Sequence, residues 1–135
     1  MRLRDWPGRF SVLVDSVRAR PFEWGAHDCC LWAASAVEAI TGRDPGAQWR
    51  GSYATARGAL DLLEGVGGLE GAGALTGKPI PVALAFVGDV GLVNWPDGVE
   101  SLAVCSGHDW MCAGDNGLIR LPIDAARSAW GVGRE

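Results

Sequence analysis

The segment that decides the fold is HDCCLWAASAVEAITG, residues 27–42. Asp28 is a favourable N-cap residue and Gly42 is a favourable C-terminal stop. Almost every residue between them is apolar, which predicts a helix that starts near Asp28 and stops before Gly42. A helix that is apolar on all sides is buried. We therefore expect this helix to form the centre of the fold, with Cys29 and Cys30 in its first turn.

The position of Cys29 suits a nucleophile. The N-terminus of a helix carries partial positive charge and unpaired N–H groups, which stabilise a thiolate and lower the pKa of a cysteine from its usual value of about 8.5. Cys30 is rotated by about 100° around the helix axis, so we expect that the two thiols do not point into one cleft. Cys29 shares a face with Ala33 and Ala36, whereas Cys30 shares a face with core positions. Cys29 is therefore the candidate nucleophile.

A cysteine nucleophile also needs a histidine that takes and returns the proton, and a third group that orients this histidine. The chain has two histidines, His27 and His108. His27 precedes the helix and would have to fold back over its start, whereas His108 follows a predicted strand in a hairpin turn. We expect neither of them to be the base. We interpret His27 as bonding the local backbone and Asp28 as the cap of the helix.

The rest of the sequence divides into an N-terminal helical part and a C-terminal part of short strands. Helices are predicted for residues 6–19 and 52–65, and the Gly-rich segment 65–81 is expected to be a loop with one short turn of helix at residues 69–75. Segments rich in β-forming residues follow at 87–95, 99–107, 109–114 and 117–122, and residues 122–132 are expected to add a short helix and a final edge strand. The sequence therefore predicts a single α+β domain over residues 1–135, with the N-terminal helices packed on a C-terminal antiparallel sheet.

The composition argues against several classes of protein. Hydrophobic residues make up 48% of the 135 residues, which is enough for one core and argues against disorder. The net charge of −4 and the lack of a basic patch argue against nucleic acid as a partner. No apolar run is long enough to span a bilayer and no signal peptide is recognisable, so we expect the protein to fold in a cytoplasm. The four cysteines lack the spacing of a zinc site, so we expect free thiols, no metal and no cofactor.

The order of the motifs resembles that of NlpC-type cell-wall cysteine peptidases, which have a papain-like fold. In those proteins an Asp-Cys pair opens a buried helix, a Gly-Asp strand opens the sheet, and a further strand begins with the catalytic histidine and ends in glycine. The similar stretches here are HDCCLWAASAV at 27–37, VGDVGLVNW at 87–95 and SLAVCSG at 101–107. The short strand that bears the third catalytic residue of the family is similar to DWMCAG at 109–114.

A closer resemblance is to small phage and prophage proteins of the tail module, which look like relatives of these peptidases. They share the Trp-Gly-x-(His or Asn)-Asp-Cys opening, a Gly-x-Tyr stretch like residues 51–53, a strand like residues 102–107 and a Trp near the C-terminus, here Trp130. The resemblance to the peptidases covers residues 24–113, and the two resemblances imply a papain-like, NlpC-type fold. The resemblance to tail-module proteins also implies other tail proteins as partners, and a location in the virion tail and, during assembly, in the host bacterial cytoplasm.

The resemblance breaks at the catalytic residues. Laying the strands on those of the peptidases places Cys29 at the nucleophile, Ser101 at the position of the histidine and Cys112 at the third catalytic position. A serine hydroxyl does not act as a base near neutral pH, and loss of the base costs such a triad several orders of magnitude in rate. The resemblance therefore favours the fold more strongly than the activity.

Three functions stay open at this point. The first is a structural protein with a degenerate cysteine-peptidase fold, acting at the tail tip or in tail assembly. The second is an active cysteine peptidase that cleaves peptidoglycan peptides with Cys29 as its nucleophile. The third is a module that binds a peptide or a glycan without cleaving it. Trp49 and Trp95, which fall in predicted loops, are candidates for a contact surface in the first and third cases.

Overall fold

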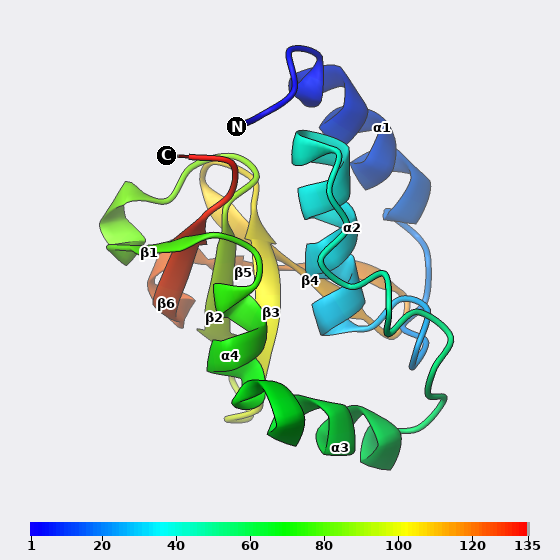
Figure 1. Cartoon of the computed structure of the whole chain (residues 1–135). Helices are drawn as coiled ribbons and strands as arrows, with labels where there is room; N and C mark the ends of the chain where they lie inside the picture. The colour runs from blue at the N-terminus through cyan, green and yellow to red at the C-terminus, as the bar shows by residue number, and fades with distance from the viewer. Residues whose placement is uncertain (135) are drawn as a thin grey trace.

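The computed structural model describes residues 1–134, and these residues form an α+β fold in which helices cover a six-stranded antiparallel sheet (Figure 1). The helices are α1 (Trp6–Val17), α2 (Cys29–Thr41), α3 (Ala56–Val66) and α4 (Gly68–Ala74). The strands are β1 (Lys78–Ile80), β2 (Val90–Asn94), β3 (Glu100–Cys105), β4 (Asp109–Gly114), β5 (Gly117–Pro122) and β6 (Ala126–Gly131). Their order in the sheet is β1-β6-β2-β3-β4-β5.

Helix α2 begins and ends where the sequence predicts. The Asp28 side chain caps its first turn, and Gly42 takes the left-handed conformation that ends it. The helix lies between α1 and the sheet, and its packing contacts are mainly with α1 and β3 (Figure 1). Its side chains fill the larger of two hydrophobic clusters, to which it contributes Trp32, Ala33, Ala36, Val37 and Ile40. The apolar composition of residues 29–41 therefore reflects burial on both sides of the helix.

The opposite face of the sheet holds the second hydrophobic cluster. This cluster includes Val93, Ala103 and Trp110 from neighbouring strands. Gly91 of β2 lies under the Trp110 ring, and a Cβ atom at that position would come within 2.6 Å of the ring. The glycine therefore lets an aromatic ring from β4 reach across β3 and pack on β2.

Several predicted boundaries differ from the structure. Strand β6 is an inner strand between β1 and β2, whereas the sequence predicts an edge strand there. The strand that takes the edge position, β1, was not predicted, because it is three residues long and contains Pro79. The predicted helix at residues 52–65 begins later, at Ala56, because Thr55 provides its cap.

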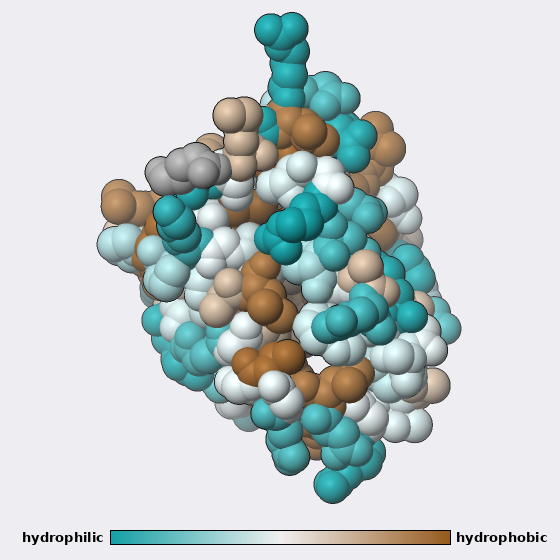
Figure 2. Space-filling view, in the orientation of Figure 1, coloured by the Kyte–Doolittle hydropathy of each residue, from teal (hydrophilic) through white to brown (hydrophobic). Residues whose placement is uncertain are grey.

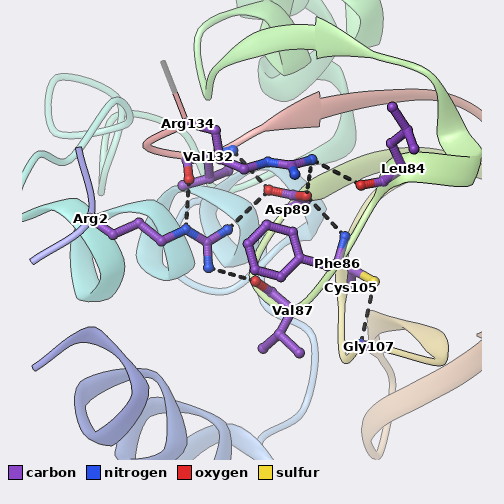
Figure 3. Close-up of polar contacts among 9 residues, drawn as sticks. All are labelled: Arg2, Leu84, Phe86, Val87, Asp89, Cys105, Gly107, Val132 and Arg134. Carbon is purple, nitrogen blue, oxygen red and sulfur yellow. Dashed lines mark hydrogen bonds and ion pairs between the residues drawn. The ribbon is translucent and has the colours of Figure 1, made fainter.

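A buried carboxylate joins the two ends of the chain to the sheet. Asp89, just before β2, is fully buried and accepts hydrogen bonds from the N–H groups of Phe86 and Val132, both at 3.0 Å. Its oxygens also form ion pairs with Arg2 at 3.0 Å and Arg134 at 2.7 Å (Figure 3). The Gly-Asp motif therefore has a structural role here, in which one aspartate holds both termini beside the start of β2.

No helix within residues 1–134 combines the length and the apolar character that crossing a membrane requires. The same part of the chain holds no group of three or more His, Cys, Asp or Glu side chains that could bind a metal ion.

Candidate functional site

The start of α2 is fixed by the buried carboxylate of Asp28. Its Oδ1 accepts a hydrogen bond from the Leu31 N–H at 3.0 Å, which caps the helix. Its Oδ2 accepts the N–H of Gly25 at 3.0 Å and the hydroxyl of Tyr53. Three donors from three parts of the chain therefore hold this side chain, and with it the position of Cys29, the next residue.

Cys29 lies where β3 and β4 separate. The two strands pair only at Val104–Met111 and Cys105–Trp110, whereas β2 and β3 pair along five residues. Leu102 is beyond the last β3–β4 pair, so its N–H is free of the ladder and donates to the Cys29 thiol. The first turn of α2 therefore occupies the opening between the strands.

The other strand at this opening is also bound to α2. The indole N–H of Trp32 donates to the carbonyl of Met111, at 2.9 Å. One residue of α2 thus contacts the backbone of β3 and another that of β4. These two hydrogen bonds fix the start of α2 against the backbone of both strands.

The thiols of Cys29 and Cys30 form a pair with their sulfurs 3.9 Å apart. The hydrogen bond from Cys30 is the main cause that lowers the pKa of Cys29, and the N–H of Leu102 acts in the same direction, whereas burial opposes both. The pKa of Cys30 is raised, first by this hydrogen bond and then by burial and the charge of Cys29. Within this pair Cys29 is therefore the more acidic thiol and Cys30 the less acidic one.

The structure brings Ser101 and Cys112 into the same region. The Ser101 hydroxyl accepts a hydrogen bond from the indole N–H of Trp95 at 2.8 Å, and it also hydrogen-bonds the Cys112 thiol. Burial, together with the charge of Cys29, raises the pKa of Cys112 to about 12. Cys112 therefore stays protonated near neutral pH. The two residues at the positions of the peptidase base and its orienting group are a hydroxyl and a neutral thiol.

Neither histidine hydrogen-bonds Cys29. His27 is buried, its ring lies edge-on to Trp32 with centroids 6.1 Å apart, and its Nε2 has no hydrogen-bond partner within residues 1–134. Burial is the main cause that lowers the pKa of His27, and the charge of Arg20 acts in the same direction. The sequence predicts that the His27 side chain bonds the local backbone, but its Nε2 atom makes no such bond.

His108 lies in the exposed turn between β3 and β4, as the sequence predicts. Ser101 is near the start of β3, whereas His108 follows its end, so the two lie toward opposite ends of that strand. His108 lines a separate hollow, together with Trp6 and Arg18. Within residues 1–134, the groups that act on the Cys29 pKa are those of Asp28, Cys30 and Leu102, and no imidazole is among them.

A cavity lies beside the thiol pair. It is almost entirely apolar, has a volume of about 80 Å³, and lies between the start of α2 and the helices α3 and α4. Figure 2 shows hydrophobic side chains gathered around a hollow in this lower part of the molecule. Cys29 and Cys30 both line the cavity, so the expectation that they face different surroundings is wrong. Two neighbouring side chains in the first turn of a helix both line one cavity when that cavity extends across the end of the helix.

The sequence analysis does not place two residues of this site next to its polar groups. Tyr53 is part of a Gly-x-Tyr stretch, but its hydrogen bond to Asp28 joins residues 25 positions apart, which local patterns do not reveal. Trp95 is predicted in a loop, and its indole instead points to Ser101. The sequence signal for both is an amphipathic aromatic residue close to a polar candidate.

Comparison with known families identifies one match. The model described as "Domain of unknown function (DUF6950)" matches residues 1–132. No curated protein and no solved structure is significantly similar to the chain. Because the match covers α1 to β6 and all of the residues of the site, the chain belongs to the DUF6950 family.

Proposed function

We propose that this protein is a non-hydrolytic structural component of a phage tail or of a phage-like particle, with a papain-like, NlpC-type fold and a degenerate cysteine-peptidase site. The observation that carries the proposal is the environment of Cys29. Its thiol is hydrogen-bonded by Cys30 and by the N–H of Leu102, and no imidazole hydrogen-bonds it within residues 1–134.

The missing imidazole matters because of the leaving group. When a thiolate attacks an amide, the amine leaves only after it has been protonated, and in cysteine peptidases a histidine delivers that proton. Cys112 and Ser101 are poor donors for this step, since the pKa of Cys112 is about 12 and the hydroxyl of Ser101 is not acidic. A thiolate without an acid therefore attacks an amide and returns to the starting state.

The arrangement of the segments supports the NlpC-type part of the proposal. The four stretches that carry the resemblance form α2, β2, β3 and β4 in the same order along the chain. Cys29, Ser101 and Cys112 come from three of these elements and act on one another electrostatically or by hydrogen bonds. The location in a tail is supported by the resemblance of the opening at residues 24–29, of residues 51–53 and 102–107 and of Trp130 to tail-module proteins.

Two assays test this function. The first is particle assembly with the Cys29→Ser variant, for which we expect normal particles, whereas deletion of the whole chain is expected to remove intact tails. The second is digestion of peptidoglycan peptides by the purified protein, for which we expect no new amino termini. Loss of particles with a folded Cys29→Ser protein, or release of amino termini by the wild type, would contradict the proposal.

The cavity favours a second candidate, a module that binds a peptide without cleaving it. The walls of the cavity are apolar, which suits an apolar peptide side chain and does not suit the hydroxyl groups of a glycan. Trp49 and Tyr53 line the cavity, so binding is expected to change tryptophan fluorescence. Titration with peptides that differ only by a Leu-for-Ser replacement tests this candidate, which requires the Leu peptide to bind more tightly.

A further inference from the structure

Helix α3 covers the cavity as a separate layer. Its packing contacts are mainly with α4, which follows it directly in the chain (Figure 1), and the cavity lies between α3 and the start of α2. Ala59 is the buried residue of α3, while Leu62, Leu63 and Val66 are half-buried and line the cavity. The apolar face of this helix is therefore turned toward a space instead of a packed core.

The thiol pair forms part of the wall of this space. Cys29 and Cys30 line it from the first turn of α2, and Leu102 lines it from β3. The Cys29 sulfur lies 3.9 Å from that of Cys30, and hydrogen bonds from Cys30 and from the Leu102 N–H lower the pKa of the Cys29 thiol. The more acidic thiol of the pair thus faces an apolar cavity whose lining residues include one charged group, the carboxylate of the capping residue Asp28.

These surroundings select the kind of electrophile that can react. Amide cleavage requires a protonated amine as the leaving group, which this site does not supply. A thioester expels a thiolate, which is a stable anion near neutral pH and leaves without an acid. The cavity volume of about 80 Å³ limits the acyl group to a short chain, since benzene occupies a cavity of roughly 150 Å³.

We propose that Cys29 is an acyl-acceptor site that takes a short apolar acyl group from a thioester donor, with the acyl chain in the cavity beneath α3. The Cys29 thiolate attacks the carbonyl carbon of the donor, so that a new sulfur–carbon bond forms. The bond between this carbon and the donor sulfur breaks, and the donor thiolate leaves with the electron pair. One thioester is exchanged for another, and nothing is oxidised or reduced.

The acyl group then stays on Cys29. Hydrolysis of the new thioester would need a base that activates water, and no imidazole hydrogen-bonds this sulfur within residues 1–134. The protein therefore becomes modified once at Cys29 and does not turn over. This inference is independent of the location in a tail, because it depends only on the thiol and the cavity.

The test is acylation of the purified protein by the butyryl thioester of N-acetylcysteamine, followed by intact mass and peptide mapping. We expect one butyryl group per chain, on Cys29, removed by hydroxylamine and absent in Cys29→Ser. A palmitoyl thioester is expected to react about tenfold more slowly or worse, because its chain exceeds the cavity. Equal rates for the two donors, or labelling mainly at another cysteine, would overturn the proposal.

Variants of α3 test the role of the cavity. Leu63→Trp fills the space and is expected to slow butyrylation by about tenfold. Leu60→Trp is the matched control, because Leu60 is 54% exposed on the same helix, and it is expected to react like the wild type. If Leu63→Trp does not fold, as judged by circular dichroism, Val66→Phe replaces it. An unchanged rate in a folded cavity variant would overturn the proposal. The assembly assay with Cys29→Ser tests the proposed function. Its outcome does not depend on the rate of butyrylation, which tests the acyl-acceptor site.

Discussion

The sulfur atoms of Cys29 and Cys30 lie 3.9 Å apart, at the point where α2 enters the opening between β3 and β4. Consecutive cysteines do not usually cooperate, but here one thiol donates a hydrogen bond to the other. The Cys29 thiol therefore has hydrogen-bond donors that favour its deprotonated form, and no imidazole hydrogen-bonds it within residues 1–134. The reactivity of this pair is the basis of the first prediction.

Replacement of Cys30 changes the reactivity of Cys29. Because the Cys30 hydrogen bond is the largest cause that lowers the pKa of Cys29, Cys30→Ala is expected to raise that pKa and to slow alkylation near neutral pH several-fold. Cys30→Ser keeps a donor and is expected to preserve more of the rate. The measurement is the rate of iodoacetamide labelling of Cys29 by peptide mass. Faster labelling in Cys30→Ala than in Cys30→Ser would contradict the assignment of the donor.

Asp28 is expected to be important for stability even though it does not act in chemistry. Asp28→Ala removes the cap of α2 and leaves the Gly25 N–H and the Tyr53 hydroxyl without their acceptor. The expected loss is about 2–4 kcal/mol in the free energy of unfolding, measured by urea denaturation. The matched control is Asp61→Ala, which removes an exposed ion pair and is expected to cost less than about 1 kcal/mol. A loss for Asp28→Ala no larger than that of the control would show that the cap and its donors contribute little.

The carboxylate of Asp89 is expected to contribute more to the free energy of unfolding than that of Asp28. Asp89→Ala leaves the guanidinium groups of Arg2 and Arg134 beside an apolar replacement, and breaking a buried pair of this kind costs about 3–5 kcal/mol. Urea denaturation measures the change, with Asp15→Ala as the control for an exposed ion pair. Asp89→Asn keeps the volume of the side chain and one acceptor, so its loss is expected to be smaller. Equal stability of Asp89→Ala and the control would contradict the joining role of this residue.

Because His27 is buried, we expect the stability of the protein to depend on pH. Its pKa in the folded protein is lowered, mainly by burial, from an unfolded value of about 6.5, so the unfolded chain binds the proton more readily. The stability that depends on neutral His27 is therefore complete above about pH 6.5 and is lost as the pH falls below that value. The difference in unfolding free energy between about pH 7.5 and about pH 5.5 is expected to shrink in His27→Gln. An unchanged difference would rule out His27 as its source.

Much of the fold follows from local patterns in the sequence. The bounds of α2 are predictable because a cap residue, an apolar stretch and a glycine stop agree with one another. The central strands are predictable because their segments are short, rich in β-forming residues and separated by turns. The position of β6 between β1 and β2 is not, because strand order depends on long-range pairing that leaves no local pattern.

The candidate site was predicted only in part. The grouping of Cys29, Ser101 and Cys112 was expected from a resemblance, and the structure brings these residues close enough to affect one another. The cooperation of Cys29 with Cys30 was missed, because helical periodicity describes side chains in the middle of a helix better than those in its first turn. The cavity was also missed, since it depends on the space between α2 and α3.

The central claim is that the Cys29 thiolate functions without an imidazole. The most direct measurement is the rate of Cys29 alkylation by chloroacetamide as a function of pH, compared between the wild type, His27→Gln and His108→Gln. The account predicts the same midpoint and the same plateau rate in all three folded proteins. A plateau that falls by about tenfold or more in either histidine variant would contradict it, because that result would identify an imidazole that activates the thiol.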